Sequence, residues 1–156
     1  MAQPSYMEIP EIPGSAKVAS QKDMIEVLAF DYGVLIPTDP KDGSTAGARR
    51  HGAMEITKNF DKASPKLADF LVNGTTIPEA TIHWFRTNDA GQWEEYFWHK
   101  IEGARVTEMK TFMMDVDDPE KASYKHMERV SFRFDKITWH CEEGQIEAMD
   151  SWKEQE

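Results

Sequence analysis

The sequence contains one cysteine, Cys141, so no disulfide can form within the chain. It also lacks any apolar run near the roughly 18 residues that a membrane-spanning helix needs. The N-terminus, MAQPSYMEIPEIPG, has neither a basic start nor a continuous hydrophobic stretch. These absences predict a protein that is made in the reducing cytoplasm, does not enter membranes, and leaves the cell, if at all, without a signal peptide.

Basic residues are in short supply. The chain has 18 Lys and Arg against 28 Asp and Glu, which gives a formal net charge of −10. Proteins that bind nucleic acid usually carry a clustered basic face, and anionic membranes attract the same kind of surface. We therefore expect neither nucleic acid nor a membrane as a partner.

Motifs for metal binding and covalent catalysis are absent as well. The candidates for a metal site lack the short spacing of strong metal motifs: His83, His99, His140 and Cys141. No G-x-S-x-G elbow and no glycine-rich phosphate loop occurs, and the many carboxylates lie in segments typical of solvated turns. The sequence therefore predicts no metal, no cofactor and no catalytic residue.

The stretch Ile56–Leu71, ITKNFDKASPKLADFL, predicts a strand followed by a short helix. A β-patterned run ends at Phe60, Ser64 is placed to cap the helix, and Pro65 suits the first helical position. Gly74 follows as the left-handed residue that ends the helix. The cap and the buried face of this helix are therefore assigned to Ser64, Pro65, Leu67, Phe70 and Leu71.

Most of the remaining chain has the pattern of β-strands. Met24–Ile36 is apolar on both faces, which predicts one strand that meets a second sheet, the helix or another subunit. Glu79–Arg86 and Trp93–Lys100 form a predicted hairpin, and Arg105–Met114 continues in extended form after a bend at Gly103.

A phase slip marks the last long run of strand pattern. Arg129–Trp139 changes its alternation at Asp135-Lys136, which indicates a bulge or a barrel corner. The sequence has no internal repeat and no domain boundary. The expected fold is a single domain, residues 1–156, that is mainly β: a two-sheet β-barrel, closed or nearly closed, with one flanking α-helix and a long extended loop.

The long loop is Pro37–Gly52, which has no periodicity, and loops of this length are usually functional or disordered. Its basic end, Arg49-Arg50-His51, is the densest basic cluster of the chain. The candidate contact residues in this loop are Asp39, Lys41, Asp42, Arg49, Arg50 and His51.

Three motifs resemble the haemolysin-coregulated protein (Hcp) family, the tail-tube component of type VI secretion systems. They are the D-K-A-S-P-x-L corner in Ile56–Leu67, W-F-R-T-N-x-A-G-x-x-E-x-Y-F in Trp84–Lys110, and M-E-x-V-S-F-x-F followed by K-I-T-W in Asp118–Trp139. Gly14–Phe30 also fits the opening of that family. The segment Cys141–Trp152 departs from it, since only Gly144 and the Asp-Ser-Trp ending match.

The resemblance implies a non-enzymatic structural protein. It implies homohexameric rings that stack into a hollow tube, are fired by a contractile sheath with a spike, and carry effector proteins in the lumen before secretion. Pro37–Gly52 matches the family's loop that contacts neighbouring subunits or the next ring. We expect its basic end to face an acidic segment of another ring, unless these charges only keep the loop soluble; that segment is Asp115, Asp117, Asp118 and Glu120.

Two other classes of function stay open. Three tryptophans, Trp84, Trp93 and Trp98, crowd one hairpin, which is typical of a core or subunit seam but also of a surface that stacks on sugars. The chain could then be a monomeric β-barrel that binds glycans or small ligands. A hydrolase with a carboxylate pair is the weaker third interpretation.

Overall fold

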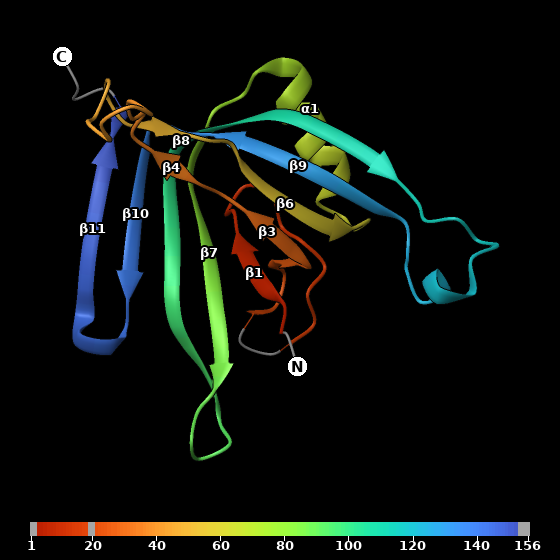
Figure 1. Cartoon of the computed structure of the whole chain (residues 1–156). Helices are drawn as coiled ribbons and strands as arrows, with labels where there is room; N and C mark the ends of the chain where they lie inside the picture. Colours follow the sequence, from red (N-terminus) through yellow and green to blue (C-terminus); the bar gives the residue numbers. More distant parts are fainter. Residues whose placement is uncertain (1–2, 19–20, 153–156) are drawn as a thin grey trace.

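The computed structural model describes residues 3–18 and 21–152. The fold is mainly β with one α-helix (Figure 1). Residues 19–20, which fall within the family-like stretch Gly14–Phe30, and residues 1–2 of the expected leaderless N-terminus lie outside the described part. The strands are β1 (Ser5–Glu8), β2 (Ile25–Val27), β3 (Ala29–Asp31), β4 (Val34–Leu35), β5 (Arg50–His51), β6 (Met54–Asn59), β7 (Ile77–Thr87), β8 (Trp93–Phe112), β9 (Met127–Arg133), β10 (Lys136–Cys141) and β11 (Ile146–Ser151), and the helix is α1 (Ser64–Asn73).

The longest strand, β8, joins two sheets. Its first half pairs with β7 and β10, and its second half, from Arg105, pairs with β9. The strand order is β2-β1-β7-β8-β9-β6-β3, and β10 and β11 branch off β8. Between the halves Gly103 has φ +63°, and a Cβ there would lie 2.5 Å from Asp135 Oδ2. The predicted bend at Gly103 is therefore confirmed, and the close approach of Asp135 leaves no room for a side chain.

The sheet does not close by hydrogen bonds. Among the described residues the end strands β2 and β3 are not paired to each other, and only Leu28 separates them in the chain. The predicted two-sheet barrel with a flanking helix is confirmed in its nearly closed form. The slip at Asp135-Lys136 falls between β9 and β10, where the chain passes from one half of β8 to the other.

The single strand predicted for Met24–Ile36 is wrong. The segment forms three short strands that pair with three different partners: β2 with β1, β3 with β6, and β4 with β5. Both faces are apolar because the segment turns a corner. Ile25 and Val27 are buried in the first sheet, whereas Val34 and Leu35 leave the body and are exposed.

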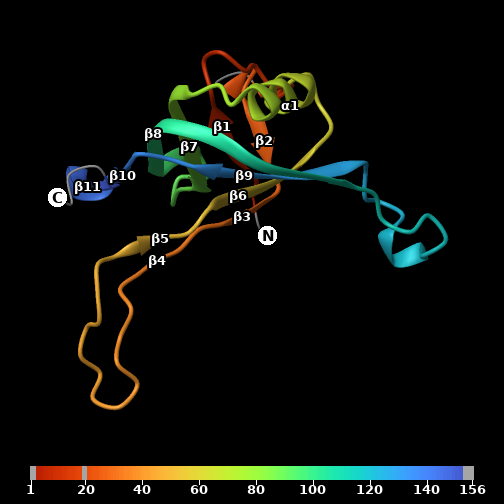
Figure 2. The ribbon, with the colours of Figure 1, turned by 90° about the horizontal axis from the view of Figure 1, so that it is seen from above.

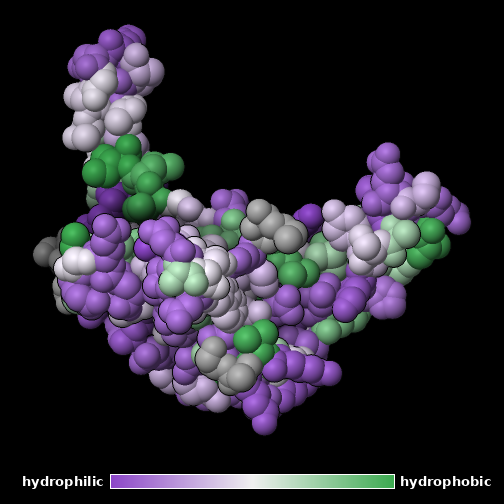
Figure 3. Space-filling view, turned by 90° about the horizontal axis from the view of Figure 1, so that it is seen from below, coloured by the Kyte–Doolittle hydropathy of each residue, from purple (hydrophilic) through white to green (hydrophobic). Residues whose placement is uncertain are grey.

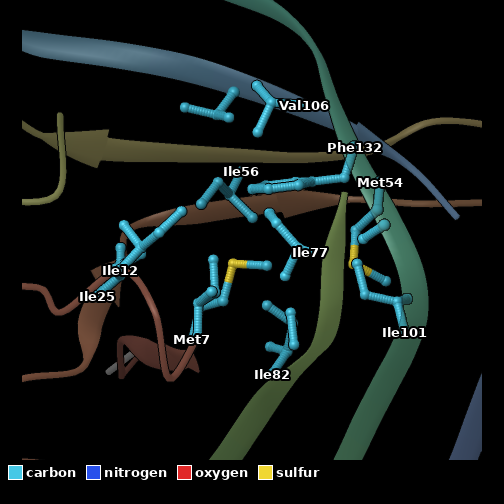
Figure 4. Packing of buried hydrophobic residues seen from close by; sticks show 14 of the residues in the cluster. Met7, Ile12, Ile25, Met54, Ile56, Ile77, Ile82, Ile101, Val106 and Phe132 are labelled. Carbon is cyan, nitrogen blue, oxygen red and sulfur yellow. The ribbon is translucent and has the colours of Figure 1, made fainter. Parts of the chain in front are cut away.

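Apolar side chains from both sheets fill the interior (Figure 4). Met7, Ile25 and Ile77 from the first sheet meet Met54 and Phe132 from the second, and all are fully buried. The helix α1 lies over one face of the second sheet (Figure 2), and its Leu67 is fully buried in the same cluster. Phe70 and Leu71 are half-buried against it, so the predicted apolar face of the helix is confirmed.

The predicted cap at the helix start is wrong. Ala63 takes the cap position and makes no side-chain cap bond, so Ser64 and Pro65 are the first helical residues. The Ser64 hydroxyl instead accepts the Asp61 N–H at 3.1 Å and donates to Glu128 Oε1 at 2.7 Å. The helix ends as predicted, with Gly74 at φ 62° donating to the carbonyl of Leu71.

Candidate functional site

A projecting hairpin, residues 34–51, is the feature that the sequence described as a long loop; we call it the arm. Strands β4 and β5 pair only with each other in the described chain, Thr38 bridges Thr45, and the hairpin extends away from the body (Figure 2). The tip is ordered by its own hydrogen bonds. Asp39 Oδ1 accepts the Lys41 N–H at 2.8 Å, and Asp42 Oδ1 accepts the Ser44 N–H at 2.9 Å.

The base of the arm is apolar. Val34, Leu35 and Ile36 are 46%, 59% and 48% exposed, and they form a hydrophobic patch between the polar tip and the body (Figure 3). Isolated exposed apolar residues are common on monomers, but a contiguous patch marks a surface that another molecule covers.

Residues at both ends of the arm belong to one hydrogen-bond network with the C-terminal strand β11. His51 is 4% exposed, its Nδ1 lies 2.6 Å from the Tyr32 hydroxyl, and its Nε2 lies 2.6 Å from Asp150 Oδ2. Arg49 donates to the same Asp150 oxygen at 2.5 Å and to the carbonyl of Ser151 at 2.9 Å. We call Tyr32, Arg49, His51 and Asp150 the arm-base cluster.

Aromatic rings cover the His51 side chain of this cluster. Trp152 stacks on the His51 ring at 5.3 Å between centroids, and Phe134 meets the same ring edge-on at 5.6 Å. Arg133 donates to the His51 carbonyl at 3.0 Å. A carboxylate only accepts hydrogen bonds, so the Nε2 of His51 carries the proton toward Asp150, and in the neutral ring Nδ1 accepts from the Tyr32 hydroxyl.

These contacts change how the basic end of the arm is interpreted. Arg49 and His51 bind inside their own chain, and of the three residues Arg49, Arg50 and His51, only Arg50 is exposed. The expectation that all three face an acidic segment of another ring is therefore wrong for His51, which is buried. Asp39 and Asp42 shape the arm tip, and Lys41 is exposed there.

The electrostatics of the cluster follow from burial and from Arg49. Burial, with a smaller effect from the Asp150 charge, raises the pKa of Tyr32 to about 12. The hydrogen bond from Arg49 lowers the pKa of the Asp150 carboxyl, against the opposing effect of burial. At neutral pH the cluster therefore holds a neutral phenol beside an ionised carboxylate.

The raised pKa of Tyr32 predicts that the folded protein loses stability at alkaline pH. Because its folded pKa of about 12 lies above the ordinary 10.0, its contribution is complete below pH 10 and is lost as the pH rises toward 12. Tyr32→Phe should remove this part of the pH dependence when urea unfolding is followed from about pH 8 to about pH 11. Tyr124→Phe, at a tyrosine that is 53% exposed, is the control and should leave it unchanged. An identical alkaline slope in Tyr32→Phe would contradict the assignment.

The second sheet has one face that no helix of the described residues covers, which we call the free face. It is formed by β3, β6, β9 and the second half of β8, and α1 lies on the opposite side (Figure 2). In the described chain β3 pairs only with β6, and Arg105–Phe112 pairs only with β9. This half of the molecule is thus a four-stranded sheet with two unpaired edges.

The acidic segment lies at the other end of the free face from the arm (Figure 2). Asp115 Oδ1 accepts the Asp117 N–H at 2.9 Å, and Asp118 Oδ1 accepts the Glu120 N–H at 3.0 Å at the start of the short 3-10 helix Pro119–Lys121. The structure therefore brings no arm residue to this segment within one chain. Beside it a groove is lined by Leu28, Phe112, Met114, Tyr124 and Met127, among others.

The whole chain resembles known proteins. The family model described as "Type VI secretion system effector, Hcp" matches residues 6–141. The major exported protein of Pseudomonas aeruginosa is 34% identical, over 98% of this chain and 97% of that protein. The solved structure of Hcp1 from E. coli EAEC 042 is 34% identical, covers 97% of this chain and 99% of its own, and has a TM-score of 0.85; Hcp3 from P. aeruginosa is 29% identical, with 97% and 99% covered and a TM-score of 0.79.

The chain belongs to the Hcp family. It is a structural subunit of the type VI secretion tube, a class of secreted, self-assembling protein whose members form hexamers. Across residues 3–18 and 21–152, no helix is long and apolar enough to span a membrane.

The tryptophans do not form a common surface on this Hcp protein. Trp84 packs toward the core, with its ring edge-on to Phe30 at 4.9 Å. Trp98 is the cross-strand partner of His83, the residue next to Trp84, so it points to the opposite face of the sheet and stacks on His140 at 4.6 Å. The cluster of three that suggested a glycan site is thus divided between two faces.

Sequence reasoning missed Tyr32 and the role of Asp150. Asp150 lies 99 positions from His51 along the chain, so no local period connects them. The one available signal was the Asp-Ser-Trp ending shared with the family. It marked Asp150 and Trp152 as part of an ending that matches the family, but gave no role and no partner for either residue.

Proposed function

We propose that copies of this chain join side by side into a hexameric ring, with the base of the arm and the sheet edges as the contacts. The exposed apolar patch Val34, Leu35 and Ile36 carries this proposal, because nothing in the described chain covers it. The apolar groove at the other end of the free face, with Phe112 and Tyr124 among its walls, supports it. An arm and a groove at opposite ends suit a head-to-tail contact, and such contacts close into rings.

The two unpaired edges fit the same arrangement. An exposed edge strand presents free backbone N–H and C=O groups that pair readily with another chain. Here β3 stands at one edge and Arg105–Phe112 at the other, so the edges differ and again favour a head-to-tail ring. The free face would then line the inside of the ring, since α1 covers the other side.

Rings of this kind would stack into a hollow tube that a contractile sheath drives, with a spike at its end and effector proteins in the lumen. Arg50 and Lys41 are the exposed arm cations that can meet Asp117 or Glu120 of another copy. Surface pairs are worth only ~0–1 kcal/mol each, so they would adjust the register between copies rather than hold them together.

The protein would act through these surfaces rather than by catalysis. One grouping that resembles catalytic chemistry, Tyr32 with His51 and Asp150, is held at the arm base with His51 only 4% exposed. Secretion of the assembled tube follows from the same role.

Light scattering on the purified protein tests the proposal. A ring should have about six times the 17.9 kDa of one chain, and electron micrographs should show annular particles with a central hole. A particle of 17.9 kDa at every concentration would overturn the proposal and favour a monomeric binding module.

A further inference from the structure

We infer that the arm is latched to the body by the C-terminal strand, and that this latch, formed by the arm-base cluster, sets the direction of the arm for assembly. The inference rests on the proposed function, in which the arm contacts the neighbouring copy. It adds that β11, which takes no part in the proposed contacts, controls whether those contacts can form.

Apart from the arm-base cluster and the hydrogen bond from Arg133 to the His51 carbonyl, little holds the direction of the arm. The chain enters it after Gly33 and leaves it at Gly52, and one hydrogen bond of 2.8 Å joins these two glycines. Strands β4 and β5 are two residues long and are not paired with the main sheet in the described chain. A ladder this short cannot orient a projection that includes the whole tip.

The arm-base cluster supplies the missing constraint on β5. Arg49 and His51 both bind Asp150 Oδ2, and Arg49 also binds the carbonyl of Ser151, so the C-terminal end of the arm is attached to β11 at three points. Tyr32 directly precedes Gly33, at the start of the arm, and its hydroxyl binds the other ring nitrogen of His51. Both ends of the arm therefore belong to one hydrogen-bond network.

Water has little access to the His51 imidazole at the centre of this network. The His51 side chain is 1% exposed and that of Asp150 is 22% exposed. The ring of Trp152 covers the imidazole. Hydrogen bonds to a charged carboxylate in such a site are strong, and a partner left alone there is costly, so the latched state is favoured over intermediate positions of the arm.

The C-terminal strand β11 is the part of the latch that can detach. Strand β11 pairs with β10 alone among the described strands, and four of its six residues, from Ile146 to Met149, are exposed. Displacing this edge strand would remove Asp150 and Trp152 from the arm together, whereas the core strands would keep their pairing.

Two matched pairs of variants test the latch. Asp150→Ala removes the shared acceptor, and Glu147→Ala removes a carboxylate of the same strand that is not in the cluster. Arg49→Gln weakens the latch, and Lys66→Gln, at an exposed cation of α1 outside the proposed contacts, is its control. Asp150→Ala and Arg49→Gln should raise the protein concentration needed for half-maximal ring formation by about tenfold or more, and the two controls should leave it unchanged.

The direction of the arm can be measured apart from assembly. One spin label on the native Cys141 of β10 and one on Ser44→Cys at the arm tip report the distance between the body and the tip, in rings diluted with unlabelled copies or in single chains. The latched protein should give one narrow distance distribution, and Asp150→Ala a broad one with unchanged circular dichroism. If Asp150→Ala fails to fold, Arg49→Gln carries the same test.

The outcomes separate the two proposals. If the unmodified chain forms no rings, the proposed function fails. If it forms rings, while Asp150→Ala and Arg49→Gln keep both the narrow distribution and the original assembly threshold, the latch is overturned and the arm takes its direction from elsewhere.

Discussion

Replacing Lys58 by methionine should destabilise the folded protein by about 3–5 kcal/mol, because it leaves the Glu128 carboxylate buried without its cation. Lys58 is 0% exposed and Glu128 is 3% exposed. The Lys58 ammonium forms an ion pair with Glu128, lies 2.9 Å from Asp61 Oδ1, and donates to the Ser64 hydroxyl at 3.0 Å. The loss would therefore include the start of α1 as well as the pair.

The double variant Lys58→Met/Glu128→Leu should recover most of this loss, since a buried ion pair replaced by apolar side chains of similar size is often neutral or stabilising. Urea unfolding of both variants measures the two effects. Lys62→Met is the control: its ammonium pairs with Asp23 at 2.9 Å, but the side chain is 52% exposed, so the change should stay within ~1 kcal/mol. A Lys58→Met protein as stable as the original would show that the pair is not buried in solution.

The pair also shows what could be predicted from the sequence. Lys58 follows Met54 and Ile56 at every second residue, so the alternation places it on the core side of its strand. Charged residues are almost never fully buried unless they are paired, and the partner Glu128 lies 70 positions away. The face of Lys58 was therefore readable from the sequence, and its partner was not.

Local signals predicted the elements that depend on local chemistry. The αL residue Gly74, the bend at Gly103 and the break at Asp135-Lys136 each follow from the conformational limits of a few residues, and all three are present. The prediction of one strand for Met24–Ile36 failed because the alternation of apolar residues cannot show where a strand leaves one sheet for another. The apparent strand is a corner whose two ends have different neighbours.

The candidate site was predictable in outline only. The long loop and its basic end were recognised, but a cluster of opposite charges around His51 depends on β11 lying beside β5, which is a matter of tertiary structure. Sequence reasoning assigned Arg49 and His51 to a contact with another copy because they belong to a basic cluster in the loop that the family resemblance assigns to such contacts. This end of the loop is buried instead of solvated because the rings of Trp152 and Phe134 cover His51.

Replacing Leu35 by aspartate should abolish ring formation while leaving the single chain as stable as before. Leu35 is 59% exposed and buries little surface against its own chain, so the substitution should cost the monomer almost no stability. In a ring, burying a leucine is worth about 1.5–3 kcal/mol, and an unpaired carboxylate in its place costs more than that gain. The defect repeats at every contact around a closed ring.

Val72→Asp is the matched control for this prediction. Val72 is 75% exposed, more than Leu35, but it lies on α1 and away from the arm. Both variants add the same charge at an exposed apolar position, so only a difference in location can separate them. Light scattering should give the mass of one chain for Leu35→Asp and of the full ring for Val72→Asp. Full-sized rings from Leu35→Asp would show that the base of the arm lies outside the interface, and would leave the unpaired sheet edges as the contacts that hold the ring together.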